Sequence, residues 1–460
     1  MRRLQPLRAL HPRHPLPPHS YQPDDDVPFW RKSPLKEGLS AIVPPLPPTP
    51  KDDHSLHVVH ISAELAPIAK VGGLGDAVAG LASACVARGH HVECMLPFYE
   101  CIDEAELEGL EKEPRKLQSF FKRGSVGADV YKGTVDGLPV VLIRPDSNLF
   151  KGGAIYGGGY NEMEAYLYFT RACLEYLHQT GRQPHIIHYH DWHTAVAPVL
   201  YWDVYSPLGL NQSKVVLTIH NMDNTGECKT EELDWTGLDG EEYKVDERMM
   251  DPRTKGHNPE RLSLLKGGIV YSSAVTTVSP GYAAELMSGG SAGWMKDTLV
   301  ANKSKVKGLL NGIDTTIWDP TRDTVLPAQY SPLHAAPKAL CKEFVMKGLG
   351  MPTDKDVPLV VCVSRLVPQK GIHLIKQALR KTAQLGGAFV LLGSAPVAGT
   401  TAEFEELREE LEAEFPLVKL LLMYSDPLSH HLYAAADFVL VPSMFEPCGL
   451  TQVRHLKWNQ

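Results

Sequence analysis

Short, continuous apolar runs alternate with longer amphipathic stretches from residue 55 onward, and this alternation constrains the fold of the 460-residue chain more than any other feature. Apolar runs without polar interruptions predict strands buried on both faces, as in parallel sheets covered by helices. The expected strands are His57–Ile61, His91–Pro97, Pro139–Arg144, His185–Tyr189, Lys214–Ile219 and Ala274–Val278; the expected helices are Asp76–Arg88, Glu162–Gly181, Thr194–Val204 and Arg261–Tyr271. The sequence therefore predicts an α/β fold with a doubly wound sheet.

A second cycle of the same kind follows Trp318–Pro337, a segment rich in Pro, Asp and Thr. Its expected strands are Pro358–Val363, Ala388–Leu392, Val418–Met423 and Asp437–Val441; its expected helices are Gly371–Leu385, Ala402–Glu414 and Ser429–Ala435. We expect a first domain over residues 55–320, a linker over 321–337 and a second domain over 338–460. A doubly wound domain usually has five or six strands, so we expect the second domain to be incomplete.

The first fifty residues differ in composition from the rest of the chain. They hold 13 of the 36 prolines, and residues 1–22 carry four arginines and no acidic residue. An arginine-rich, acid-poor start is typical of an organelle transit peptide, whereas a proline-rich segment is typical of a disordered leader without a targeting function. We expect a leader over residues 1–54, and its residues leave both interpretations open.

Charge and hydropathy narrow the classes of partner. A net charge of −8 argues against a general nucleic-acid-binding protein, which is usually basic. No apolar run approaches the roughly 18 residues that span a bilayer. We therefore expect neither nucleic acid nor a membrane as a partner.

Two glycine-bearing loops follow expected strands, at Lys70–Asp76 (KVGGLGD) and Glu446–Gln452 (EPCGLTQ). Such a loop exposes backbone N–H groups, and a following helix adds a partial positive charge, so each loop suits a phosphate group. Neither loop matches GxGxxG or GxxxxGK[ST], and a turn that only joins a strand to a helix is the alternative. As a pair, the loops predict a two-domain transferase that acts on a nucleotide-linked group.

Two cations, Arg365 and Lys370, bracket the loop after the strand expected at Pro358–Val363. An arginine fork and a lysine point charge together suit a diphosphate leaving group without a metal ion, whereas solvated surface charges are the alternative. Glu446 precedes a proline, which favours an extended backbone. Its carboxylate is suited to orienting the hydroxyls of a sugar, with a plain surface charge as the alternative.

Histidines cluster in the segment from His188 to His193, with the sequence HYHDWH. A metal site formed by His188, His190 and His193 with an oxygen of Asp191 is conceivable, and a helix capped by Asp191 beside a cleft is the alternative. We expect no metal, because no second cluster completes the set. His220 and Asn221 follow another expected strand, as a structural hydrogen-bonded pair or as a pair that faces a ligand.

Six motifs occur in the order of one family: KVGGLGD, HDWH, TIHN, LNGID, SRLVPQKG and FEPCGLTQ. They stand at Lys70–Asp76, His190–His193, Thr218–Asn221, Leu310–Asp314, Ser364–Gly371 and Phe445–Gln452. On these motifs the sequence resembles the plant starch synthases and bacterial glycogen synthases over about residues 55–452. The segments His257–Arg261 and Thr276–Pro280 are more similar to the plant and algal branch.

The resemblance implies a GT-B glycosyltransferase, in which two Rossmann-like domains face a cleft. It implies transfer of glucose from ADP-glucose to the non-reducing end of an α-1,4-glucan, with retention of configuration and no cofactor or metal. It also implies a plastid location (chloroplast or amyloplast) and association with other starch-synthesis enzymes.

The resemblance assigns roles to residues that match the family's motifs. The implied catalytic residues are Asp76, His220, Arg365, Lys370 and Glu446. The implied ADP-glucose contacts are Lys70, Gly72, Gly73, Asn311, Arg365, Lys370, Cys448, Gly449, Leu450 and Thr451, and the implied glucan or cleft-lining contacts are Tyr156, Asp191 and Trp192.

The family continues beyond FEPCGLTQ with a helix, a strand and a TGGL segment, which do not follow Gln452 here. We therefore expect a truncated second domain, and a non-catalytic glucan-binding or regulatory relative is the alternative function. An NAD-dependent α/β enzyme is disfavoured, because the GxGxxG motif is missing.

Overall fold

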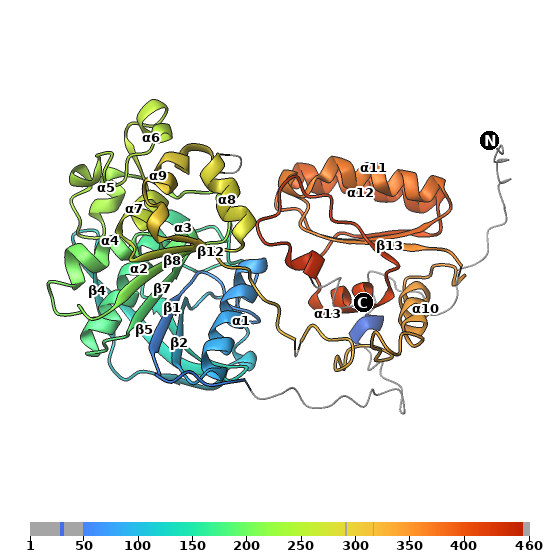
Figure 1. Cartoon of the computed structure of the whole chain (residues 1–460), viewed down its shortest axis with the longest axis horizontal. Helices are drawn as coiled ribbons and strands as arrows, with labels where there is room; N and C mark the ends of the chain where they lie inside the picture. The colour runs from blue at the N-terminus through green and yellow to red at the C-terminus, as the bar shows by residue number, and fades with distance from the viewer. Residues whose placement is uncertain (1–27, 32–48, 290–291, 316, 355, 454–460) are drawn as a thin grey trace. The chain divides into compact units, whose positions relative to one another are not determined.

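The computed structural model describes residues 28–31, 49–289, 292–315, 317–354 and 356–453, and it divides into two compact units (Figure 1). The N-terminal unit comprises Leu46–Ile313 with Pro447–Leu450. The described residues of the C-terminal unit lie within Asp314–Glu446, together with residues 28–31 and 451–453. Most of the predicted leader lies outside the described residues. None of the described helices is long and apolar enough to cross a membrane.

In the described part of the N-terminal unit, a ten-stranded sheet has the first strand of the sequence at its centre. Its parallel portion runs in the order β12-β11-β8-β7-β1-β2-β6. These strands are β1 (His57–Ile61), β2 (His91–Pro97), β6 (Leu138–Pro145), β7 (Ile186–His190), β8 (Lys214–Ile219), β11 (Ala274–Thr277) and β12 (Val306–Gly308). β1, β2 and β7 are buried along almost their whole length, which requires cover on both faces. The predicted doubly wound parallel sheet is confirmed.

The sheet also has an antiparallel extension that the sequence analysis missed. β5 (Gly124–Val135) pairs with β6, and both β3 (Glu108–Lys112) and β4 (Leu117–Phe121) pair with β5. β4 alternates between buried and exposed residues, and β3 is mostly exposed. Antiparallel strands with one solvated face lack the continuous apolar run on which the prediction relied.

The longest helices of this unit are α1 (Gly73–Ala87) and α2 (Glu162–Gln179), close to their predicted bounds. The shorter ones are α3 (Asp191–Thr194), α4 (Ala197–Leu200), α5 (Thr230–Asp234), α6 (Pro252–Gly256), α7 (Leu264–Tyr271), α8 (Pro280–Ser288) and α9 (Lys296–Ala301). The helix predicted over Arg261–Tyr271 is shorter than expected, because Arg261–Ser263 forms β10 and pairs with β9 (Glu227–Lys229). The helix predicted over Thr194–Val204 is divided among α3, α4 and a π-helical turn at Tyr201–Tyr205.

The described part of the C-terminal unit has four parallel strands in the order β15-β14-β13-β16. They are β13 (Leu359–Val363), β14 (Ala388–Leu392), β15 (Val418–Leu421) and β16 (Phe438–Val439). Alternate residues of β14 enter two separate cores: Val390 joins a core with α10 (Lys338–Gly348) and α13 (Asp426–Ala435), whereas Phe389 joins one with α11 (Ile372–Gln384) and α12 (Ala398–Glu414). Figure 1 shows these helix pairs on opposite faces of the sheet.

Two segments outside the predicted domains carry buried side chains. Within the predicted leader, Phe29–Arg31 forms a 3₁₀ turn, and Trp30 is only 2% exposed in the core of the C-terminal unit. Within the predicted linker over 321–337, Leu326 and Tyr330 are buried, and Asp323 lies 2.5 Å from Nδ1 of His430. Large apolar side chains stabilise these segments by burial, which a composition rich in proline and polar residues does not reveal.

Candidate functional site

The first strand of each unit marks the point where the direction of winding changes. β1 lies between β2 and β7, and β13 lies between β14 and β16. In open α/β sheets, ligands bind outside the carboxyl ends of the strands at such a point. The loops that follow β1, β7, β13 and β16 carry most of the predicted site residues. Each unit therefore presents a candidate half-site.

The glycine loop (Lys70–Asp76) is held by a glutamate that the sequence analysis missed. Oε2 of Glu64 accepts hydrogen bonds from the backbone N–H groups of Val71, at 2.9 Å, and Gly72, at 3.1 Å. Oε1 accepts a 2.8 Å hydrogen bond from the hydroxyl of Tyr156. The Gly72 N–H is thus hydrogen-bonded within this unit, and its contact with a phosphate stays a prediction. An acidic residue three positions after β1 was the only signal for Glu64.

The loop leads into α1, which starts at Gly73. The first N–H groups of a helix have no partner within the helix, and its dipole favours negative charge there. Nζ of Lys70 lies 2.9 Å from Oδ1 of Asp76, in the first turn. These two predicted site residues therefore neutralise each other at the start of α1.

The second glycine segment is divided between the units. Ser279 donates a 2.8 Å hydrogen bond to the carbonyl oxygen of Pro447, and Cys448 packs against the core of the N-terminal unit. Cδ1 of Leu450 lies 3.5 Å from the position that a Cβ on Gly73 would take. Predicted residues from the two glycine motifs thus meet at the start of α1. Gly449 belongs to the same unit, whereas Thr451 belongs to the C-terminal unit.

The aromatic residues predicted to meet the glucan are largely covered. Trp192 is 8% exposed and packs edge-on against Tyr166. Gly226 makes room for the indole: its φ is +64°, and a Cβ there would lie 2.6 Å from the ring. Tyr156 stacks on His193 with 5.3 Å between ring centroids. Trp192 also lines a hollow of about 280 Å³.

Asp191 binds the backbone that carries His220. Its Oδ1 accepts hydrogen bonds from the N–H groups of His220, at 2.6 Å, and Asn221, at 3.4 Å. Asp191 has a φ of +57°, an uncommon conformation for a residue with a side chain. Burial raises the pKa of this carboxyl to about 7. The predicted glucan-contacting residue is thus placed to position His220. Asn311, a predicted ADP-glucose contact, donates its backbone N–H to the carbonyl oxygen of Val278.

A row of buried imidazoles lies beside Asp191. His60 on β1 pairs in register with His188 on β7, and one ligand nitrogen from each of His60, His188 and His190 lies within 4.8 Å of the others. Burial lowers the pKa of His60 to about 4 and of His220 to about 3. This set differs from the predicted cluster, because His193 packs against Tyr156 and Tyr166 while His60 takes its place.

In the C-terminal unit, the loop after β13 meets the segment after β16. Nζ of Lys370 lies 2.7 Å from Oε2 of Glu446, so two predicted catalytic residues form an ion pair. Gly371 permits this approach: its φ is +68°, and a Cβ there would lie 2.2 Å from the carbonyl oxygen of Pro442. Arg365 is exposed in the same loop. A lysine ammonium has three donors, so the pair leaves two for another anion.

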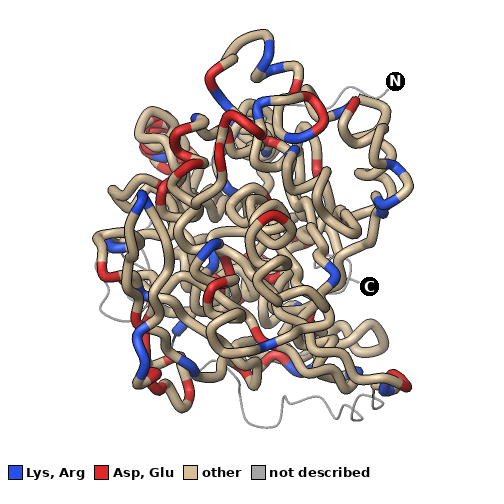
Figure 2. The backbone as a smooth tube through the Cα atoms, turned by 90° about the vertical axis from the view of Figure 1, so that its left-hand side faces the viewer, with Lys and Arg blue, Asp and Glu red and all other residues tan. Residues whose placement is uncertain are grey.

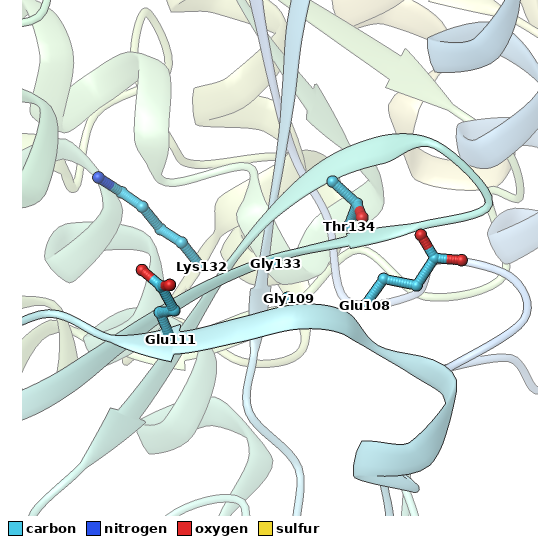
Figure 3. A pocket seen from close by; sticks show the side chains of 6 residues that line it. All are labelled: Glu108, Gly109, Glu111, Lys132, Gly133 and Thr134. Carbon is cyan, nitrogen blue, oxygen red and sulfur yellow. The ribbon is translucent and has the colours of Figure 1, made fainter.

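A larger hollow, of about 470 Å³, lies away from all of these residues, between β3 and β5 (Figure 3). Gly109 and Gly133 face each other there without side chains, and the register of the two strands shifts between Glu108 and Glu111. The hollow arises because these two glycines have no side chains to fill it. In the view of Figure 2, basic and acidic residues are interspersed along the described backbone, so no broad basic face is evident there.

The fold and the two half-sites define a class of enzyme, the GT-B glycosyltransferases, which are built from two Rossmann-like units. The model of the starch synthase catalytic domain matches residues 57–300. The chain belongs to the starch synthase family.

Three relatives illustrate the similarity. The probable starch synthase 4 (chloroplastic/amyloplastic) of Arabidopsis thaliana is 43% identical over 401 residues, which cover 86% of this chain and 38% of that protein. A glycogen synthase of Protochlamydia amoebophila is 40% identical over 411 residues, covering 86% of this chain and 81% of that one. The solved catalytic domain of starch synthase IV from Arabidopsis thaliana, bound to ADP and acarbose, superposes with a TM-score of 0.85 at 42% identity, covering 88% of this chain and 82% of that chain.

Proposed function

We propose that this chain transfers glucose from ADP-glucose to the non-reducing end of an α-1,4-glucan, with retention of configuration. The observation that carries this proposal is the similarity to a starch synthase catalytic domain whose structure holds ADP and acarbose. The ordered motifs of this chain supply residues of the right chemistry for both ligands.

The main task of such an enzyme is to stabilise the departing diphosphate while the glucose carbon passes through an oxocarbenium-like transition state. Arg365 supplies a planar fork, and Lys370 supplies an ammonium whose position is held by Glu446, 2.7 Å away. These two cations are assigned to the diphosphate, so no metal ion is required for charge neutralisation. Asp76, His220 and Glu446 are assigned to the transferred glucose.

The location and partners of the enzyme follow from the same relationship. We assign it to plastids, because one relative is named chloroplastic/amyloplastic and residues 1–22 are arginine-rich. Targeting of a fluorescent protein by residues 1–54 tests this assignment. Association with other starch-synthesis enzymes stays a prediction, which co-purification from the source tissue tests.

The experiment measures incorporation of labelled glucose from ADP-glucose into glycogen by the full 460-residue chain. We expect incorporation that EDTA does not reduce, and a fall in turnover by orders of magnitude in Lys370→Ala. Lys376→Ala is the matched control, because Lys376 lies on α11 and pairs with Glu403. Glucan binding without incorporation by the folded chain would instead favour the non-catalytic alternative. Near-normal turnover in Lys370→Ala would remove Lys370 from its assigned role.

A further inference from the structure

Two buried imidazoles and one half-buried imidazole form a continuous hydrogen-bonded chain in the N-terminal unit. Nδ1 of His60 lies 3.1 Å from Nε2 of His190, and Nδ1 of His190 lies 3.1 Å from Nε2 of His220. His60 is on β1, His190 ends β7 and His220 follows β8, so the chain crosses three neighbouring strands. It starts in the core, where His60 is 1% exposed, and it ends at a residue assigned to the transferred glucose.

Each ring in this chain is neutral near pH 7. Burial lowers the pKa of His60 to about 4 and of His220 to about 3, and it holds the pKa of His190 well below its usual range. A neutral imidazole has one N–H donor and one acceptor nitrogen. His190 therefore donates one of its two hydrogen bonds and accepts the other, and the whole chain runs in a single direction.

The far nitrogen of His60 selects that direction. Nε2 of His60 is buried without a hydrogen-bond partner among the described residues. If the chain ran from His220 towards His60, this nitrogen would carry a buried N–H with no acceptor. If the chain runs from His60 towards His220, this nitrogen carries only a lone pair. Buried donors without an acceptor are rarer in folded proteins than buried acceptors without a donor. His60 therefore donates to His190, and His190 donates to Nε2 of His220.

We infer that His60 is a positioning residue: through His190, it holds His220 as the tautomer whose proton is on Nδ1. The inference rests on the proposed function, in which His220 contacts the transferred glucose. In this tautomer, His220 offers an N–H donor to a sugar hydroxyl and to negative charge that develops nearby. The other tautomer would present a lone pair, which accepts a hydrogen bond from a hydroxyl but repels negative charge that develops on the oxygen.

The neighbouring imidazole of His188 supplies a matched control. It lies on the same strand as His190 and stacks on that ring with 4.4 Å between centroids. Its Nε2 instead lies 2.6 Å from the hydroxyl of Thr218, which lies 2.6 Å from the hydroxyl of Thr276. His188 is 9% exposed and pairs with His60 across the sheet, but among the described residues no hydrogen bond joins it to His220. Replacing it tests the loss of a buried, hydrogen-bonded imidazole that lies outside the chain.

The first test is nitrogen-15 NMR of the full chain labelled at histidine, which distinguishes protonated from bare ring nitrogens. The signals of His220 are assigned by their loss in His220→Asn. We expect a protonated Nδ1 and a bare Nε2. A protonated Nε2 on His220 would overturn the inference, even if the wild type incorporates glucose. The measurement needs no activity, so a failure of the proposed function leaves it readable.

The second test compares three variants by kinetics. His60→Leu removes the donor, and we expect kcat to fall about 10- to 100-fold, as for other residues that orient a ligating histidine, with KM for ADP-glucose unchanged. His60→Asn keeps an N–H donor near the position of Nδ1, and we expect it to recover most of this loss. For His188→Leu we expect a kcat within about twofold of the wild-type kcat, because His188 does not orient His220.

Equal losses in His60→Leu, His60→Asn and His188→Leu would overturn the inference, because they would show a packing role alone. If His60→Leu does not fold, the comparison of His60→Asn with the wild type and the NMR measurement still decide. Stoichiometric zinc in the purified protein, lost on replacing His190, would also overturn it, because both ring nitrogens of His190 belong to the chain. A nitrogen that binds a metal ion carries no proton.

Discussion

Three buried and two half-buried histidines predict that the N-terminal unit loses its stability in mild acid. Burial lowers the pKa of His60 to about 4 and of His193 and His220 to about 3, and it holds the pKa of His188 and His190 well below 6.5. In the unfolded chain each imidazole titrates near its ordinary value of about 6.5. Stability from these depressed pKa values is complete above about pH 6.5, and it is lost as the pH falls towards the folded values.

Asp191 acts in the opposite direction. Burial raises its pKa to about 7 from 3.8, so its contribution is complete below pH 3.8 and is lost as the pH rises towards 7. Around pH 5, unfolding therefore takes up about five protons on the histidines and releases about one from Asp191. Each proton changes the free energy of unfolding by about 1.4 kcal/mol per pH unit, which gives a fall of about 5 kcal/mol per unit. A folded domain is stable by only about 5–15 kcal/mol.

The assay is urea unfolding between pH 7 and pH 5, followed by circular dichroism, with limited proteolysis and mass spectrometry to identify the unit that unfolds. His188→Leu should reduce the slope by about one proton, or about 1.4 kcal/mol per pH unit. His54→Leu is the control, because this histidine is exposed. A wild-type slope below one proton would refute the reasoning, since the imidazoles would then keep nearly the same protonation in the folded and unfolded chain.

Two further predictions concern residues that support the loops of the N-terminal unit. Glu64→Ala removes the acceptor of two glycine-loop N–H groups and of the Tyr156 hydroxyl, and we expect a loss of about 2–4 kcal/mol in urea unfolding. Glu64→Gln keeps an acceptor oxygen and should lose less; equal losses would contradict this. Gly226→Ala should cost about 3 kcal/mol or more, because its Cβ would lie 2.6 Å from Trp192 at a positive φ. Gly181→Ala is the control: its φ is +66°, no atom lies within 4 Å of the new Cβ, and it should cost about 1 kcal/mol. Equal costs for Gly226→Ala and Gly181→Ala would show that backbone strain, and not the contact with Trp192, causes the loss of stability.

The sequence was sufficient to locate the central parallel strands and the loops that follow them. β1, β2, β8 and β14 have the predicted bounds, because strands buried on both faces need continuous apolar runs. The loop that carries Arg365 and Lys370 follows from the same pattern, since ligands meet parallel sheets at the carboxyl ends of strands. The antiparallel extension over β3, β4 and β5 did not follow, because half-exposed strands carry a weaker apolar signal.

Only the tertiary structure decided which side chains meet. Glu64 and Tyr156 are 92 residues apart in sequence, Lys370 and Glu446 are 76 apart, and His60 and His190 are 130 apart. Such pairs depend on strand order and register, which place His60 beside His188 and bring His190 opposite Thr218. The sequence by itself therefore determined the fold class, the family motifs and the edge of each sheet that carries the candidate site residues. The partner of each polar group was decided by the pairing of strands that are distant in sequence. The local sequence of a strand does not specify which residues lie opposite it in the sheet.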